Sequence, residues 1–221
     1  MKKSLALALA AALLMPFAAM AQQDREEAAE DRRDYMEEKQ EIDTMVEDAM
    51  ARLHEEVPEA KKLYDQAYGY AMFGVLKFAL GVTGGGGGGV AVVKDSGERI
   101  YMNMGTGGLG LEIGGHKYNV LFLFEDEETF NDFVYNGWTA EASAEAVAGT
   151  EGVSAATSFK DGVAVYQFGE KGLIAGADVS GSKFWIDREL SPEAVAKQEE
   201  MEAEEEAREE RAERAEEGVE R

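Results

Sequence analysis

Residues 68–93 read YGYAMFGVLKFALGVTGGGGGGVAVV, an apolar stretch interrupted by six consecutive glycines at positions 84–89. A second glycine string, GTGGLG at 105–110, matches the G-x-G-x-x-G pattern of nucleotide-binding loops. Such a loop must open a helix whose amino terminus meets the phosphates, whereas strand-like residues follow both strings, at 90–93 and 111–113. The glycines therefore indicate strands that bend and pack closely, because a missing side chain lets backbones approach each other.

The glycines also mark the extent of the folded domain, since all of them except Gly218 lie between Gly69 and Gly181. Charge and composition change on either side of this region. The chain then divides into four parts: a leader at 1–21, an acidic helical segment at 22–62, the domain at 63–190 and an acidic, Glu/Arg-rich tail at 191–221.

Alternating or continuous apolar residues predict strands in this domain. Residues 100–104 alternate, and 120–124 are continuously apolar, as in a strand buried on both faces. Further strands are expected at 138–147, 163–168, 173–179 and 183–187. The links at 169–172 and 180–182 have hairpin length, so the last three strands are predicted to form an antiparallel meander, with a turn at 160–162 before it.

The segment at 22–62 reads as a helix with a heptad-like apolar stripe: Tyr35, Ile42, Val46, Ala49 and Leu53. Pro58 should stop or bend this helix, and a second short helix is expected from Glu59 to Tyr68. The stripe has two interpretations, packing on the domain or a homo-oligomeric coiled coil. The stripe barely reaches the three or four heptads that a coiled coil needs, so packing is favoured.

Two more helices are expected. Four acidic residues at 125–128 favour a helix amino terminus, Phe130 and Phe133 share a face with Val134, and Gly137 follows as a stop. The tail after Pro192 has no large apolar stripe but contains i, i+4 pairs of opposite charge, Glu204 with Arg208 and Glu210 with Arg214. These pairs indicate a solvated helix.

These elements predict an α+β fold. Its centre is a glycine-rich, twisted antiparallel sheet, either a sandwich or a partial barrel. Amino-terminal helices, one inserted helix and a charged carboxyl-terminal helix complete it.

The amino terminus reads as a secretory signal. Lys2 and Lys3 precede an apolar run at 5–14 that is too short to span a bilayer, and small residues precede a cleavage point after Ala21. No cysteine follows that point, so a lipoprotein anchor is not expected. We expect a periplasmic or secreted mature protein.

Composition excludes several classes of function. The formal net charge is −23, and a surface this negative repels phosphate backbones, so no nucleic-acid partner is expected. The chain has no cysteine and only two histidines, His54 and His116, both interpreted as surface residues. No catalytic residue, metal ligand or cofactor-binding residue is therefore predicted.

Four segments in one collinear order resemble the SYLF domain family: Tyr68–Val93, Gly107–Gly114, Val120–Val134 and Val163–Ile186. The resemblance extends over about residues 64–187, and the exported bacterial branch is the most similar. It implies an α+β domain with a glycine-rich sheet and lipid or membrane binding, and in eukaryotic members an interaction with actin.

The chain departs from the family at two places. Eukaryotic members have a basic amphipathic helix before the domain, whereas 22–62 is acidic here, and residues 100–102 replace a tryptophan-containing motif. The family usually carries a basic residue near an apolar turn, and the residues here that match are Phe73, Leu76, Lys77 and Phe78. These four are the lipid-binding candidates. For the three apolar ones the alternative is an ordinary core position.

The sequence supports two hypotheses of function and leaves the oligomeric state open. The first is a non-catalytic, exported lipid-binding or envelope-associated module, with a membrane lipid as partner. The second is a protein-interaction or assembly module that engages a protein partner through its charged terminal helices.

Overall fold

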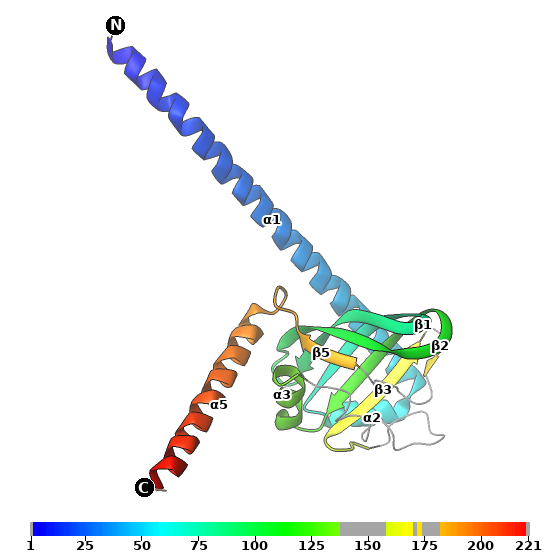
Figure 1. Ribbon diagram of the computed structural model, residues 1–221. Coiled ribbons are helices and arrows are strands. Elements are labelled where there is room, and N and C mark those ends of the chain that lie inside the picture. Colours follow the sequence, from blue (N-terminus) through cyan, green and yellow to red (C-terminus); the bar gives the residue numbers. More distant parts are fainter. Residues whose placement is uncertain (1, 138–157, 170–171, 174–181, 220–221) are drawn as a thin grey trace. The chain divides into compact units, whose positions relative to one another are not determined.

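The computed structural model describes residues 2–137, 158–169, 172–173 and 182–219, and it has the predicted α+β fold (Figure 1). The predicted strand at 138–147 lies outside these residues, as does most of the one at 173–179. The elements in chain order are α1 (Lys2–Glu56), α2 (Pro58–Gln66), β1 (Gly69–Val93), β2 (Arg99–Phe124), α3 (Glu127–Tyr135), β3 (Val163–Gly169), β4 (Gly172–Leu173), β5 (Ser182–Ile186) and α5 (Pro192–Val219).

The chain forms two compact units, Met1–Glu41 and Ile42–Arg221. The first is the amino-terminal part of α1, and almost all of its described side chains are exposed, including Tyr35 and Met36. Cleavage of a leader at 1–21 stays a prediction. Within the described residues, no helix is both long and apolar enough to cross a bilayer.

In the second unit, the end of α1 packs on the sheet through its apolar stripe. Four residues of the predicted stripe are buried: Ile42, Val46, Ala49 and Leu53. The preference for packing over a coiled coil is confirmed for these residues, since burial in one chain leaves them no surface for a second copy. Asp43 anchors the helix to β2 by pairing with Arg99 at 2.7 Å and accepting a hydrogen bond from the Tyr101 hydroxyl at 3.1 Å. Burial and the negative charge of Asp43 raise the pKa of Tyr101 to about 12.

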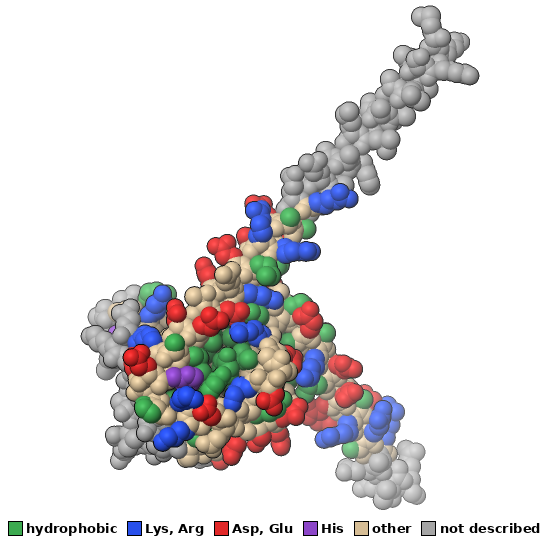
Figure 2. Space-filling view, turned by 180° about the vertical axis from the view of Figure 1, so that it is seen from behind, with side chains coloured by type: hydrophobic (Ala, Val, Ile, Leu, Met, Phe, Trp, Pro, Cys, Tyr) green, Lys and Arg blue, Asp and Glu red, His purple; other side chains and the backbone are tan. Residues whose placement is uncertain are grey.

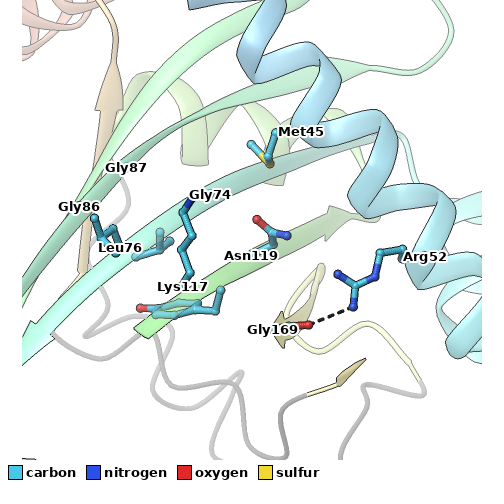
Figure 3. Close-up of a pocket in the computed structure, with 11 residues that line it drawn as sticks. Met45, Arg52, Gly74, Leu76, Gly86, Gly87, Lys117, Asn119 and Gly169 are labelled. Atoms are coloured by element: carbon cyan, nitrogen blue, oxygen red, sulfur yellow. Dashed lines mark hydrogen bonds between the residues drawn. The ribbon is translucent and has the colours of Figure 1, made fainter. Parts of the chain in front are cut away.

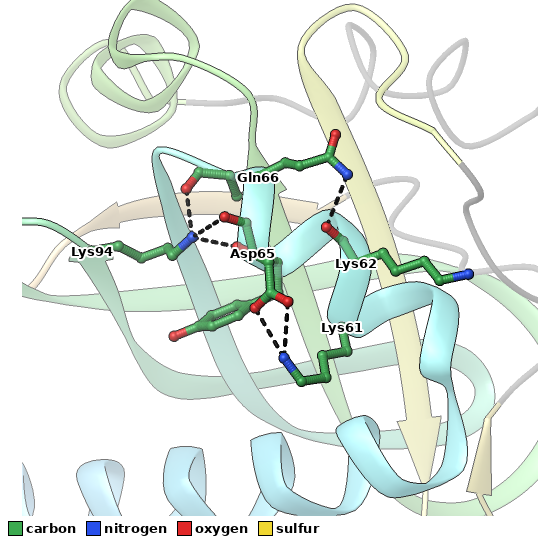
Figure 4. Close-up of polar contacts among 7 residues, drawn as sticks. Lys61, Lys62, Asp65, Gln66 and Lys94 are labelled. Carbon is green, nitrogen blue, oxygen red and sulfur yellow. Dashed lines mark hydrogen bonds and ion pairs between the residues drawn. The ribbon is translucent and has the colours of Figure 1, made fainter.

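Helix α2 begins at Pro58, as the predicted break requires, and ends at Gln66, two residues before the expected Tyr68. Lys94, which follows β1, holds its end. The Lys94 ammonium donates to the backbone oxygens of Tyr64, Asp65 and Ala67, and its Nζ lies 4.7 Å from the centroid of the Tyr64 ring (Figure 4). A lysine at a helix carboxyl terminus satisfies carbonyls that have no partner within the helix.

Strands β1 and β2 form one long antiparallel hairpin, whose register runs from Gly69 opposite Phe124 to Val92 opposite Arg99. Successive side chains point to opposite faces of the strands, so each strand contributes to two hydrophobic clusters. One cluster includes Phe73, Phe122 and Phe133 and contains residues from α3, β5 and the start of α5. The other contains residues from α1 and α2.

The glycine run lets β1 fold back on itself. A β-carbon at Gly87 would lie 1.7 Å from the carbonyl oxygen of Gly74. A β-carbon at Gly89 would lie 2.2 Å from the Met72 oxygen, and one at Gly85 would lie 2.6 Å from the Leu76 oxygen. Backbone packs directly on backbone at every second residue, which only glycine permits. The prediction of close strand packing is confirmed, and both glycine strings lie within strands rather than at helix amino termini.

The remaining strands add to the edges of this hairpin. The carboxyl half of β2 pairs with β3. Strand β3 pairs in turn with β4, as the predicted meander requires. Strand β5 pairs with the amino half of β2, which the sequence did not predict. The expected pairing of 183–187 with 173–179 falls mostly outside the described residues and stays a prediction. Strand β2 is long enough to pair with both β3 and β5, because β3 occupies only its carboxyl half and leaves the amino half to β5.

Helix α3 forms as predicted. The Asp126 side chain accepts a hydrogen bond from the backbone N–H of Thr129 at 2.9 Å, which caps the helix, and its aromatic face is buried. Gly137 follows with a φ of +69°, which suits the expected stop. The predicted turn at 160–162 is also present, with positive φ at Asp161 and Gly162.

Among the described residues of helix α5, those at its start hold it on the domain. Ala194 and Val195 are buried, whereas nearly all described side chains from Glu199 onward are exposed. The predicted pair of Glu210 and Arg214 forms an ion pair at 3.1 Å. The expectation of a solvated helix is confirmed for the described part of α5.

The close contact between the two halves of β1, which we call the crossing, gives the first prediction. Replacing Gly87 with alanine should lower the free energy of unfolding by about 3 kcal/mol or more, at the upper end of overpacking effects. A Gly84→Ala variant is the control, because a β-carbon there meets nothing within 4 Å. Urea unfolding followed by circular dichroism measures both. Equal stability of the two variants would contradict the crossing.

Candidate functional site

The four residues proposed from the sequence separate into two groups. Phe73 is fully buried in the core, so the alternative interpretation holds for it. Leu76 and Phe78 are 41% and 57% exposed and lie on the other face of β1. Lys77, which lies between these two residues in the sequence, is half-buried and points to the same face as Phe73. We refer to Leu76 and Phe78 as the exposed apolar pair.

The hairpin that carries the apolar pair has an unusual charge for this chain. Strands β1 and β2 contain Lys77, Arg99 and Lys117 but one acid, Glu112, although the whole chain carries −23. Lys117 stands directly opposite Leu76 in the register, and His116 stands opposite Lys77. Cross-strand partners have neighbouring side chains, so the Lys117 ammonium group lies on the same face as Leu76, next to it.

A groove of about 390 Å³ lies next to the apolar pair and shares Leu76 with it (Figure 3). Its lining comes from α1 (Met45, Arg52), β1 (Gly74, Val75, Leu76, Gly86, Gly87), β2 (Lys117, Tyr118, Asn119) and Gly169 at the end of β3. None of these described lining residues is acidic. We call this the basic groove, and its volume falls in the range of about 300–1,000 Å³ usual for small-molecule sites.

Glycines create the space in the groove. Gly74 lies opposite Asn119 in the register, and a β-carbon there would lie 3.4 Å from the terminal methyl of Met45 and 3.6 Å from the Asn119 side-chain oxygen. Any larger side chain at Gly74 would therefore fill the gap between α1 and the sheet.

Three polar side chains project into the groove from two elements: Arg52 from α1, and Lys117 and Asn119 from β2 (Figure 3). Arg52 donates from Nη2 to the Gly169 carbonyl oxygen at 3.1 Å and lies 3.5 Å from the Glu56 carboxylate. Both contacts use the same nitrogen, and a guanidinium has further N–H donors on its other nitrogens. The groove therefore carries a positive charge on each side of the Asn119 amide (Figure 3).

Both signs of charge occur around exposed apolar surface. Figure 2 shows one face of the molecule, where hydrophobic side chains lie in a hollow bordered by Lys and Arg as well as by Asp and Glu. The acidic chain therefore does not present a uniformly negative surface.

The histidines differ from each other. His116 is exposed, as expected, but His54 is half-buried, its ring 5.1 Å from that of Tyr64 in an edge-on arrangement. Its Nε2 is buried and has no hydrogen-bond partner among the described residues. The surface interpretation is therefore wrong for His54. Within the described residues no group of three or more histidine or acidic side chains could hold a metal ion.

The sequence interpretation missed Arg52, Lys117 and Asn119. Arg52 is one of many charges on an acidic helix, and only the fold brings it to β2. The near absence of acids from both strands of the hairpin was the available signal, because it sets this segment apart from the rest of the chain.

Fold and site define a class: an α+β domain whose glycine-rich sheet presents exposed apolar side chains beside a basic groove. A family model named Ysc84, described as a Las17-binding protein actin regulator, matches residues 105–199. Beta cell expansion factor A from Aeromonas veronii is 45% identical over 150 residues, which are 68% of this chain and 58% of that protein. The chain spans less than two thirds of this relative.

The chain belongs to the Ysc84 family, also called SYLF, and the resemblance inferred from the sequence is confirmed. The family is described by a protein partner, Las17, and by no enzymatic reaction. The contact of Leu76, Lys77 and Phe78 with lipid stays a prediction.

His54 gives a prediction of pH dependence. Burial, the main cause, and the positive charge of Lys61 lower the pKa of His54 below its ordinary 6.5, with Asp65 acting in the opposite sense. A lowered pKa means that the unfolded chain binds this proton more readily. The stability associated with neutral His54 is therefore complete above pH 6.5 and is lost as the pH falls toward the lower folded-state value.

Urea unfolding at pH 7.5 and 5.5 measures this effect. The native chain should lose more stability between the two pH values than a His54→Gln variant does. His116→Gln, which changes the exposed histidine, is the matched control and should behave like the native chain. An equal loss of unfolding free energy between the two pH values in all three proteins would show that His54 does not contribute to the pH dependence of stability.

Proposed function

We propose that this chain is a non-catalytic lipid-binding module that attaches to a bilayer surface through the exposed apolar pair. The observation that carries the proposal is the exposure of Leu76 and Phe78, 41% and 57%, on the acid-poor hairpin. Two large apolar side chains exposed next to each other on one strand face gain free energy when they leave water. Membership of the SYLF family supports the same function, because the resemblance to that family implies lipid or membrane binding.

The physical balance favours apolar contact over charge. Full burial of a leucine or phenylalanine side chain is worth about 1.5–3 kcal/mol, and these two are already partly buried, so each gains a fraction of that. A lysine near an anionic bilayer adds about 1 kcal/mol, while the acidic remainder of the chain opposes it. Attachment should therefore occur on zwitterionic as well as on anionic membranes.

Export is the second part of the proposal. The leader read at 1–21 supports it, since it would take the mature chain to the periplasm or beyond, where envelope bilayers offer a surface. The absence of cysteine agrees with a module that attaches reversibly rather than through a covalent lipid.

The apolar pair gives a direct test. A Leu76→Ser/Phe78→Ser variant should lose at least about tenfold in vesicle affinity, because it removes the apolar surface that would enter the bilayer. Co-sedimentation with phosphatidylcholine vesicles, with and without phosphatidylglycerol, measures the affinity. Met201→Ser is the matched control, since Met201 is a 38% exposed apolar residue on α5. Equal binding of the double variant and the native chain would refute attachment through this pair.

A protein-interaction module is the second candidate. The exposed part of α5 and the protein partner named in the family description favour it. Residues 203–221 can be removed without touching Ala194, Val195 or Gln198, which hold the start of α5 on the domain.

If this candidate is right, the truncated chain should keep its fold but lose a partner captured from the envelope by the full chain. Cross-linking followed by mass spectrometry compares the two. A set of captured proteins that does not change on truncation counts against the role of α5.

A further inference from the structure

The basic groove has the composition of a site for one anionic amphiphile. Its apolar side chains are Met45 and Leu76, and its positive charges are Arg52 and Lys117, which lie on opposite sides of Asn119 (Figure 3). In a chain of net charge −23, an acid-free lining with two cations is complementary to an anion. An inorganic anion alone would not use the apolar side chains, and a neutral hydrocarbon would leave both cations beside apolar surface.

The register connects the groove to the exposed apolar pair. On one face of the hairpin, Gly74 with Asn119, Leu76 with Lys117, and Phe78 with Gly115 follow one another as cross-strand pairs. The first two pairs line the groove and the third lies beyond it. An acyl chain can therefore pass from the surface that we assign to the bilayer into the groove along Leu76.

We infer that the basic groove binds a single long-chain fatty acid, with its carboxylate at Arg52 and its chain along Met45 and Leu76. The planar guanidinium of Arg52 matches a carboxylate, which can accept two parallel hydrogen bonds. Arg52 already touches Glu56 at 3.5 Å, so the fatty acid replaces or joins an existing carboxylate contact. The inference deepens the proposed lipid-binding function and names its ligand class.

Titration calorimetry with the full chain and dodecanoate, below its micelle concentration, tests the inference. Saturable binding of one dodecanoate per chain is expected. Acetate, which has the headgroup alone, should not bind, and dodecyltrimethylammonium, which has the chain with a positive head, should bind at least about tenfold more weakly. No binding of dodecanoate, or equal binding of the cationic amphiphile, would overturn the inference.

Substitutions locate the ligand. Arg52→Gln combined with Lys117→Gln should weaken dodecanoate binding at least about tenfold, since it removes the charge-assisted contact at Arg52 and the second positive charge of the groove. Lys62→Gln is the matched control, because Lys62 is an exposed cation on α2 outside the groove lining. Undiminished binding by the double variant would overturn the assignment of the carboxylate.

A third variant does not depend on charge. Gly74→Ala places a methyl group 3.4 Å from Met45, at ordinary contact distance, so the fold should hold while the groove narrows. Dodecanoate binding should fall several-fold with an unchanged melting temperature. Unchanged binding would show that the ligand lies elsewhere.

Vesicle binding separates this inference from the proposed function. Arg52→Gln and Gly74→Ala should leave co-sedimentation with vesicles unchanged, whereas Leu76→Ser/Phe78→Ser should reduce it. Dodecanoate binding without vesicle binding refutes only surface attachment. Vesicle binding without dodecanoate binding refutes only the fatty-acid site.

Discussion

The direct contact between the two halves of β1 is the constraint on which the rest of the structure depends. Gly85, Gly87 and Gly89 present backbone, with no side chain, to the carbonyl groups of residues 72–76. Because the side-chain direction alternates along a strand, three glycines at every second position are enough to let the strand cross itself. The crossing turns one 25-residue strand into two segments that share a core, and β2 pairs with both segments, with one register shift between Leu80 and Val82.

The same glycines shape the candidate site. The run contains further glycines that face away from the crossing, and a β-carbon at Gly88 would meet the Ile42 side chain of α1 at 3.4 Å. Gly74 and Gly86, which also have no side chain, line the groove together with Met45 and Arg52 of α1. Beyond the groove the face continues to Phe78, which the described part of the structure leaves 57% exposed. Folding and binding surface therefore arise from one sequence feature.

Local signals in the sequence predicted local structure well. The Asp126 cap and aromatic face of α3, the break at Pro58 and the strand character of the glycine strings all depend on residues a few positions apart. The pairing of β5 with β2 was missed because hairpin-length links give no information on a distant free edge. Period-two alternation separates Phe73 from Leu76 and Phe78, but which face is buried depends on the elements that pack there, α3 and β5 on the side of Phe73. Arg52 and Lys117 are 65 positions apart, and no local pattern joins them.

The charge distribution has a consequence for any anionic ligand. The net charge of −23 repels an approaching anion, and salt screens this repulsion beyond about 10 Å. Contacts inside the groove act at hydrogen-bond distance, where salt screens them much less. An anion without an apolar part is repelled and gains only the polar contacts in the groove. At Arg52 it competes with the Glu56 carboxylate, which already lies 3.5 Å from the guanidinium. An amphiphile adds contact with the apolar side chains, whose contribution does not depend on charge or salt. The acidic surface therefore disfavours small anions, which agrees with an amphiphile as the ligand that we propose for the groove.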